Sequence, residues 1–564
     1  MPIRLSGINS GLDTDAIVKE LVSAYSLKTE KYEKQKTTLE WKQDAWKSLN
    51  TKIYGFYTNV SNMRYSSAYS LKKATVSNPA KATVTADTDS VTGTQTLNIL
   101  QMSQASYLTG GYIGEDVTAA STLKDLGYEG GPATIKLKKP GMKEGEEIKI
   151  QIGAETKVSE ILEKFGEAGL NANLDTANGR IFLSAKESGA AANFDLIADD
   201  ANSEEALRAL GFIPETNRAE EIDRLQDEVD AYTALKAQYD DANTPTDEKI
   251  AIKKQLEAYS QDVKNIAADR ATVEDVVRKR LATKIDGQDA IITLNGVEYT
   301  STTNLFKING LSIEATGVTG PEKENAITIN TSTDTQGIYD TIKDFLTEYN
   351  TLINEITKLY NAESAKDYEP LTDEEREAMS DEQIEKWEGK IKSALLRRDN
   401  TLGGIMNAMT NAMSQSYEVD GKKFSLSSFG ISTLGFLNAA ENEQNAYHID
   451  GDEDDENTSG KKDKLMAAIQ ENPNEIMEFM KQLTSNLYTS IDEKMKSTAL
   501  SSAYKVYNDK ELDREMTDIE KLIAKWEDKI AEQEDSYFKK FSQMEAALSK
   551  LQSQTNALGG LLGQ

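Results

Sequence analysis

The residues best suited to bind a metal in this sequence form one acidic run. Asp450, Asp452 and Asp454 stand at positions one, three and five of the loop that binds calcium in EF-hand proteins. Position six of that loop would be Asp455, where glycine is needed, and position twelve would be Lys461, where a bidentate glutamate belongs. Because the pattern fails at both diagnostic positions, we expect a solvated acidic turn and no metal site.

The only histidine, His448, precedes this run, and the chain contains no cysteine. A catalytic or zinc-binding histidine would need partners that this sequence supplies only as carboxylates. The Gly-Lys-Lys triplets at 421–423 and 460–462 lack the spacing of a phosphate-binding loop, and acidic pairs are too numerous for one to stand out as a glycosidase pair. We therefore expect no catalytic, cofactor-binding or metal-binding residues, no cofactor, and a protein that is not an enzyme.

Composition limits the partners of the chain. Its 564 residues suffice for three or four domains. With 94 acidic and 64 basic side chains the formal net charge is −30, which disfavours binding to nucleic acid or to an anionic membrane. No apolar run approaches the length of a membrane span, and the first residues lack the apolar core of a secretory signal. We expect no membrane insertion, and either a cytoplasmic location or export by a route that cleaves nothing.

Two long helices, predicted at the ends of the chain, organise the elements between them. Their apolar positions recur in steps of three and four, the pattern of a coiled-coil seam, and Asp13 or Thr14 is the expected N-cap of the first helix. The N-terminal seam comprises Val18, Leu21, Tyr25, Tyr32, Leu39, Trp46, Leu49, Ile53, Phe56 and Val60. The C-terminal seam comprises Met516, Ile523, Trp526, Ile530, Tyr537, Met544, Leu551 and Leu558.

Each seam is roughly 60 Å long at the rise of an α-helix, which is more than a small domain can cover. We expect the two helices to pair with each other near Trp46 and Trp526 and to engage neighbouring subunits beyond; the alternative is a self-contained hairpin. Polar side chains occupy the second line of each seam, at Lys28, Gln35, Lys42, Gln533 and Lys540. Buried polar residues in a seam set the register at a cost in stability, which would permit exchange of partners.

Between the predicted helices the pattern changes to that of strands and back, so we expect a multidomain α+β fold. It has paired coiled-coil legs, a helical-bundle leg domain, and β-rich head domains with an inserted helical hairpin. A β-β-α-β-β module is expected around 133–188, hairpin turns at Asn178-Gly179 and Asn295-Gly296, and a break in the helical hairpin at 243–245. Further helices are expected at 391–416 and 464–496, and the segment 361–388, with its many acidic side chains, should be solvated and partly helical.

The expected domains follow in order along the chain. They are 1–72, the N-terminal leg; 73–115, the first part of a β-rich head domain; 116–217, the β-β-α-β-β head module; 218–283, the inserted hairpin; 284–335, the second part of the β-rich head domain; 336–505, a helical leg segment with acidic excursions; and 506–564, the C-terminal leg.

Several local motifs lie along the chain at 10–22, at 288–297 with 308–313, at 342–353, and at 429–435, 471–477 and 543–554. In type and order they resemble those of the flagellar hook-associated protein 2 family, the filament-capping proteins of bacterial flagella. The stretch 133–188 is similar to a small repeat module of flagellins and hook-associated proteins. The hairpin at 218–281 and the acidic segment at 361–388 look like additions to the family pattern.

The resemblance implies a ring-shaped homo-oligomer at the distal tip of the flagellar filament, outside the cell. Its heads would form a plate beneath which exported flagellin folds and inserts. Hook–filament junction proteins would be further partners, and a chaperone would hold the C-terminal segment before unfolded export through the flagellar type III apparatus. Two alternatives stay open: a flagellin-like or junction subunit, and an adhesin whose head, residues 74–330, binds host mucin or another glycan.

Overall fold

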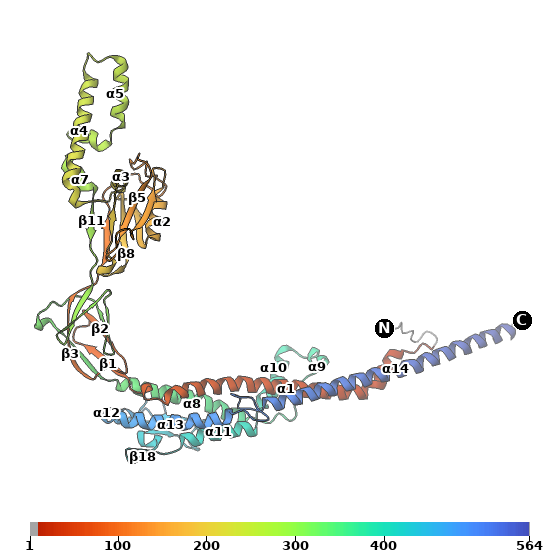
Figure 1. Ribbon diagram of the computed structural model, residues 1–564. Helices are drawn as coiled ribbons and strands as arrows, with labels where there is room; N and C mark the ends of the chain where they lie inside the picture. Colours follow the sequence, from red (N-terminus) through yellow and green to blue (C-terminus); the bar gives the residue numbers. More distant parts are fainter. Residues whose placement is uncertain (1–9, 563–564) are drawn as a thin grey trace. The chain divides into compact units, whose positions relative to one another are not determined.

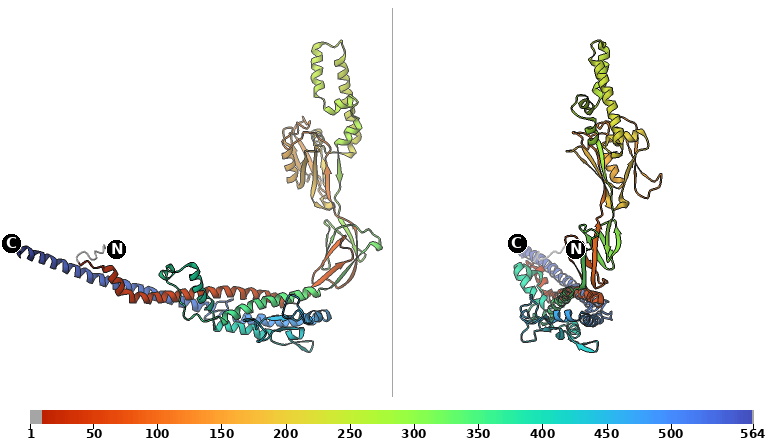
Figure 2. Two further views of the ribbon diagram at one scale, coloured as in Figure 1. Left: turned by 180° about the vertical axis from the view of Figure 1, so that it is seen from behind. Right: turned by 90° about the vertical axis from the view of Figure 1, so that its left-hand side faces the viewer.

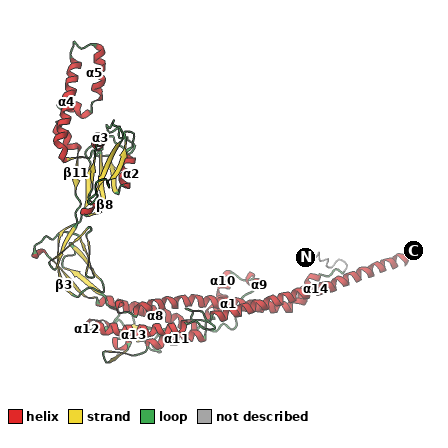
Figure 3. Ribbon diagram, viewed as in Figure 1, coloured by secondary structure: helices red, strands yellow, loops and turns green. Residues whose placement is uncertain are grey.

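The structure, a computed structural model, describes residues 10–562 and the side chains of residues 10–558. The chain divides into two units. Unit 1 combines the two ends of the chain, up to Leu71 and from Thr333 onward, and unit 2 is Lys72–Ser332. Helices dominate unit 1, whereas unit 2 contains most of the strands and a helical hairpin (Figure 3).

Unit 1 is a bundle of amphipathic helices around one apolar core (Figure 1). Ile53, Ile342, Met409 and Leu483 come from four different helices and have no exposed surface. Burial of each such side chain stabilises the bundle by about 1.5–3 kcal/mol. The helices are α1 (Thr14–Met63), α8 (Thr335–Asn361), α9 (Asp373–Glu377), α10 (Asp381–Ala394), α11 (Asn400–Met413), α12 (Lys464–Glu471), α13 (Pro473–Met495) and α14 (Asp509–Leu562).

Two predicted helices of unit 1 are interrupted. The one expected at 391–416 breaks between α10 and α11, where Arg398 has a φ of 53° and Asp399 caps the new helix. The one expected at 464–496 breaks at Asn472, because Pro473 cannot continue a helix and begins α13 instead. Two short hairpins join these helices: β17 (Tyr417–Val419) with β18 (Lys422–Phe424), and β19 (Ile431–Thr433) with β20 (Tyr447–Ile449).

Unit 2 contains a β-sandwich. Its core side chains, among them Leu97, Ile292 and Ile313, come from both sheets. At the predicted hairpin, Asn295 and Gly296 have φ angles of 53° and 81° and join the paired residues Leu294 and Val297, as a type I′ turn requires. One sheet has the order β1 (Lys72–Val76), β16 (Ile327–Thr333), β3 (Gly93–Gln101), β12 (Ala290–Leu294), β13 (Val297–Ser301), and the other has β14 (Leu305–Ile308), β15 (Leu311–Ala315), β2 (Ala82–Ala86).

A second β domain of unit 2 holds the predicted β-β-α-β-β run. Its elements are β5 (Ala133–Lys138), β6 (Ile148–Ile152), α2 (Val158–Glu167), β7 (Leu170–Asp175) and β8 (Arg180–Ser188), and Gly179 turns β7 into β8 as expected. These five elements pack around one apolar core, which includes Ile135, Phe165 and Leu183. The domain also contains β4 (Ala105–Thr109), β9 (Asp195–Ile197), α3 (Ala201–Ala209), β10 (Ile213–Pro214) and β11 (Leu281–Ile285). Its strands form two sheets, β6-β5-β9 and β10-β11-β4-β8-β7.

Strands β4 and β11 cross the expected domain boundaries. We expected 105–109 to belong to the first part of the β-rich head domain and 281–283 to the hairpin. In the structure β4 pairs with both β8 and β11 in the sheet of the second domain. An edge of β8 needs a strand to satisfy its backbone groups, and local pattern does not indicate which strand supplies them.

The inserted hairpin leaves and re-enters this domain. Helix α4 (Arg218–Asp240) ends before the predicted break at 243–245, which is confirmed. The returning arm is three helices instead of one: α5 (Thr246–Ala258), α6 (Gln261–Ala267) and α7 (Val273–Arg280). Ser260 and Thr272 each accept a backbone N–H and so cap a new helix, which divides the arm. No helix in the described part of the chain is long and apolar enough to cross a lipid bilayer.

Candidate assembly surfaces

Helices α1 and α14 pair in an antiparallel arrangement, and both views of Figure 2 place them side by side. Asp13 caps α1, accepting a hydrogen bond from the backbone N–H of Ala16. The partner in α14 moves toward lower numbers as the position along α1 advances. In order, the contacts join Ser10 to Glu545, Tyr25 to Trp526 with ring centroids 6.3 Å apart, Lys36 to Glu520 at 3.2 Å, and Gln43 to Asp513 at 2.6 Å.

The inner end of this pair is fixed by Trp46 and Asn50 of α1, both buried. The Trp46 ring stacks on Tyr507, with centroids 5.4 Å apart. The side chain of Asn50 accepts a hydrogen bond from the backbone N–H of Val506 at 2.9 Å and donates one to the carbonyl of Tyr504 at 3.3 Å. These contacts hold the segment that leads into α14 against α1.

The predicted N-terminal seam is largely buried within the single chain. Leu21 is exposed, whereas Val22 and Thr29 are buried, so the second line of the outer seam runs one residue later than predicted. A straight helix repeats every 3.6 residues, so its buried stripe drifts relative to a strict heptad. Of the predicted residues, Val18, Leu39, Trp46, Leu49, Ile53, Phe56 and Val60 are buried, and Tyr25 and Tyr32 are half-buried.

Because of this shift, two of the polar residues predicted to lie in the seam lie outside it. Lys28 and Gln35 are exposed, and the Lys28 ammonium lies 4.5 Å from the centroid of the Trp526 ring. Lys42 forms an ion pair of 3.3 Å with Asp399. The expectation that Lys28 and Gln35 are buried polar residues is therefore wrong for the isolated chain.

The C-terminal seam is covered only in part. Met516, Ile523, Trp526, Ile530, Tyr537 and Met544 are half-buried. Because Glu545 lies opposite Ser10, the later part of α14 passes the start of α1, as Figure 1 shows. In that extension Leu551 and Leu558 are 57% and 58% exposed. We call residues 546–558 the distal segment of α14.

The acidic segment after α8, residues 361–388, returns to α1, and an open groove of about 640 Å³ lies between them. Lys34 of α1 lies 3.4 Å from Glu375. Burial opposes the charge of Lys34, but hydrogen bonds to Glu30 and Glu375 outweigh it and raise the pKa of the ammonium. The segment is helical in part, as predicted, but one side rests on α1 instead of facing solvent.

We call the hollow between this segment and α1 the basic groove. It has a cationic rim of Lys31, Lys34, Lys42, Lys366 and Arg397 and an apolar lining of Leu39, Ile391, Leu395 and Ile519.

The acidic run at 450–456 follows strand β20. Lys343 of α8 lies 2.6 Å from carboxylate oxygens of both Asp452 and Asp454, and His448 Nδ1 lies 2.6 Å from Asp455. The hydrogen bond to Lys343, and then its charge, lower the pKa of Asp454. In the described residues no group of three or more His, Cys, Asp or Glu side chains is arranged to hold a metal ion. The run is a turn anchored to α8 by a lysine.

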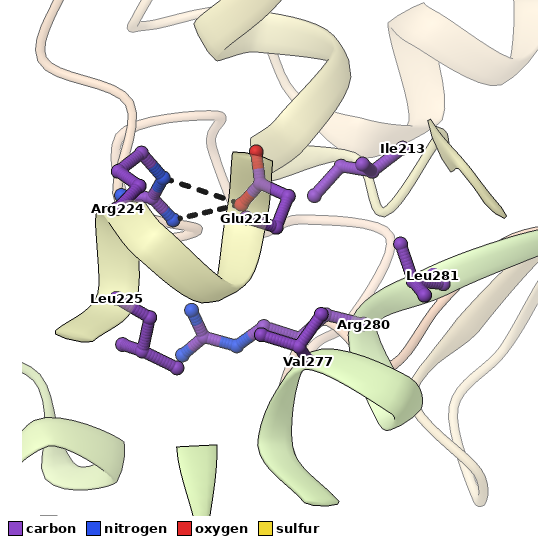
Figure 4. Close-up of a pocket in the computed structure, with 7 residues that line it drawn as sticks. All are labelled: Ile213, Glu221, Arg224, Leu225, Val277, Arg280 and Leu281. Atoms are coloured by element: carbon purple, nitrogen blue, oxygen red, sulfur yellow. Dashed lines mark hydrogen bonds and ion pairs between the residues drawn. The ribbon is translucent and has the colours of Figure 1, made fainter. Parts of the chain in front are cut away.

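A buried carboxylate anchors the hairpin of unit 2 at its base (Figure 4). Glu221 of α4 lies 2.6 Å from Arg208 and 3.1 Å from Arg224. Arg280 at the end of α7 lines the same hollow and forms an ion pair with Asp262. The pair between Glu221 and Arg208 of α3 thus fixes the first arm of the hairpin to the β domain, whereas the pair between Arg280 and Asp262 joins α7 to α6 within the returning arm. No sequence motif indicated either contact.

Comparison with known proteins assigns the family. The model of the flagellar hook-associated protein 2 N-terminus matches residues 10–106 and that of its C-terminus matches residues 287–553, together more than half of the chain.

Two curated relatives are both named flagellar hook-associated protein 2. That of Halalkalibacterium halodurans is 22% identical over 603 residues and covers 99% of each chain. That of Thermotoga maritima is 22% identical over 613 residues, with 98% of this chain and 94% of the relative covered. The crystal structure of the flagellar cap protein FliD D1-D2-D3 domains from Escherichia coli is 17% identical, with 79% of this chain and 95% of that chain covered and a TM-score of 0.44. The chain belongs to the flagellar hook-associated protein 2 family, the structural proteins that cap the filament of the bacterial flagellum.

Proposed function

We propose that this filament-cap protein works as a ring of identical copies at the distal tip of the flagellum, outside the cell. In this ring, unit 1 forms the leg that meets flagellin and unit 2 forms the head. Flagellin subunits leaving the filament channel fold under the heads and insert between the legs. No catalytic step is part of this proposal.

The observation that carries the proposal is the uncovered distal segment of α14. Leu551 and Leu558 follow one another at a spacing of two helical turns and are more than half exposed. Exposed leucines forgo about 1.5–3 kcal/mol each, which a protein surface in the filament would recover. The seam residues that α1 covers hold the leg together, and those beyond its start remain for a neighbour or for flagellin.

The same segment accounts for the proposed route to the tip. An apolar helix face would be covered before assembly by an export chaperone bound to the C-terminal segment. A chain without cysteine forms no disulfide that would block passage of the unfolded polypeptide through a type III apparatus. At the base of the ring, the legs would meet the hook–filament junction proteins before the first flagellin arrives.

A strain that lacks this chain provides the test. We expect it to release unpolymerised flagellin into the medium, and the full chain to restore filaments seen by electron microscopy. Leu551→Ser with Leu558→Ser should fail to restore them. Gln552→Ser with Gln554→Ser is the matched control, because it places the same number of serines in the same exposed helix and, since glutamine and leucine have similar helix propensities, lowers the helix propensity comparably.

Two outcomes would contradict the proposal. Normal filaments in the strain without the chain would refute the cap function. Full restoration by the leucine variant would refute the role of the distal segment. The family match favours the cap over a flagellin-like or junction subunit and over an adhesin, so neither alternative is proposed.

A further inference from the structure

The most exposed large apolar side chains reported for the described residues are two neighbours in unit 1. Phe436 and Leu437 are 82% and 92% exposed. They lie between β19 and β20 in a turn closed by Gly435, whose carbonyl accepts hydrogen bonds from the N–H groups of Asn438 and Ala439. Gly435 has a φ of 77°, which glycine adopts without strain. The turn therefore presents this pair, the apolar knob, on an ordered backbone.

The basic groove, in the same unit, has an apolar lining that could receive the apolar side chains of the knob. Its volume of about 640 Å³ is in the range of sites that enclose a drug-sized ligand, so it has room for two side chains. Leu39, Ile391 and Leu395 give it an apolar lining. The knob of the same chain does not fill it, because both knob side chains remain exposed.

Charges around the two surfaces are complementary. The loop that carries the knob has two acidic side chains, Glu441 and Glu443, and no basic residue from 434 to 447. Five basic side chains surround the groove, and Glu369 and Glu515 are its acidic lining residues. Lys34 and Lys42 are already paired with Glu375 and Asp399, so the cations offered to a partner are those of Lys31, Lys366 and Arg397. Complementary charge of this kind orients two protein surfaces as they meet.

The two surfaces also lie near the same level of the leg. In the knob loop, Asn442 Oδ1 accepts a hydrogen bond of 3.2 Å from Asn361 at the end of α8. One residue earlier in α8, the carbonyl of Tyr360 accepts a bond of 3.0 Å from the N–H of Arg398, next to Arg397 on the groove rim. Legs standing side by side would therefore bring a knob and a groove to similar heights.

We propose that the apolar knob of one copy docks in the basic groove of a second copy. Two different surfaces on one protein make a head-to-tail contact, and such contacts close into a ring when the rotation between copies allows it. The inference rests on the proposed ring and names the leg surfaces that would join its members.

Cysteine cross-linking tests the contact directly, because the chain has no cysteine of its own. One full-length variant carries Thr38→Cys in the groove and a second carries Leu437→Cys in the knob. Mixed under oxidising conditions across a concentration series, they should form a covalent dimer that contains one copy of each. A partner with Lys423→Cys, in the exposed β17–β18 hairpin, is the matched control and should cross-link to Thr38→Cys at least tenfold less.

A second variant measures the strength of the contact. Phe436→Ser with Leu437→Ser changes only exposed side chains, and unchanged circular dichroism would confirm that it folds. We expect its self-association, measured by sedimentation velocity, to weaken at least tenfold. Equal cross-linking to the control cysteine, or self-association unaffected by the serines, would overturn the inference. Either result would leave the cap function standing, since that is judged by filament restoration in cells.

Discussion

Truncation of Trp46 tests whether α1 and the segment before α14 form one folded leg in solution. The ring is buried and stacked on Tyr507. Replacement of a buried tryptophan by alanine costs about 3–5 kcal/mol, which includes the cavity that remains. With a urea dependence of about 3 kcal/mol per molar for a unit of this size, the midpoint of unfolding of Trp46→Ala should fall by roughly 1 M or more.

Trp526 provides the comparison at the outer end of the same helix pair. It is half-buried, tilted against Tyr25 and flanked by Lys28 and Lys529. An aromatic pair and exposed cation–π contacts together contribute about 1–2 kcal/mol. Trp526→Ala should therefore shift the midpoint less than Trp46→Ala does, and Trp46→Phe, which keeps an aromatic ring against Tyr507, should fall between them.

Tryptophan fluorescence is a selective assay for this comparison, because all four tryptophans lie in unit 1: Trp41, Trp46, Trp387 and Trp526. Unit 2 contributes no tryptophan signal, and each variant retains three reporters. A midpoint for Trp46→Ala equal to that of the unaltered chain would refute the reasoning, as would a larger loss for Trp526→Ala. Either result would mean that the stacked contact does not stabilise the leg.

Three further perturbations follow from single contacts. Asn50→Ala leaves the backbone N–H of Val506 buried without its partner and should cost unit 1 about 1–3 kcal/mol in urea unfolding. Glu221→Gln weakens the buried ion pairs at the base of the hairpin and should cost about 2 kcal/mol, read as faster protease cleavage near 215–218, where α4 begins; unchanged cleavage would contradict the anchoring role. The pKa of Asp454 is lowered from its ordinary 3.8 by Lys343, so this stabilisation is complete above that value and is lost as the pH falls through the lowered pKa. Lys343→Met should therefore make the urea midpoint of unit 1 less sensitive to acid than that of the unaltered chain.

Local signals predicted much of the fold. The cap at Asp13, the turn at Asn295-Gly296 and the break before Thr246 depend on a few adjacent residues, and each occurs as expected. The long legs were predictable because their apolar positions repeat over many turns, and the family motifs lie along much of the chain in order.

Contacts between distant segments were not predictable in this way. Sheet membership of β4 and β11 depends on which strand covers an edge, and the sequence around 105–109 carries no sign of it. The second line of the outer seam was misplaced because Leu21 is apolar and Thr29 is not, although Thr29 is the buried one. The basic groove arises only where the segment after α8 meets α1, so neither segment alone indicates a cavity.

The pairing of α1 with α14 sets the timing of folding. Ser10 and Glu545 touch across 535 positions of sequence. The inner half of α1 packs on α8 and α13, but its outer half has no companion until α14 has been made. Closing a loop of that length is entropically costly and slow compared with folding of the strands in between. The pairing of α1 with α14 is accordingly the last contact of the leg to form, and a copy that ends before α14 leaves the outer half of α1 uncovered.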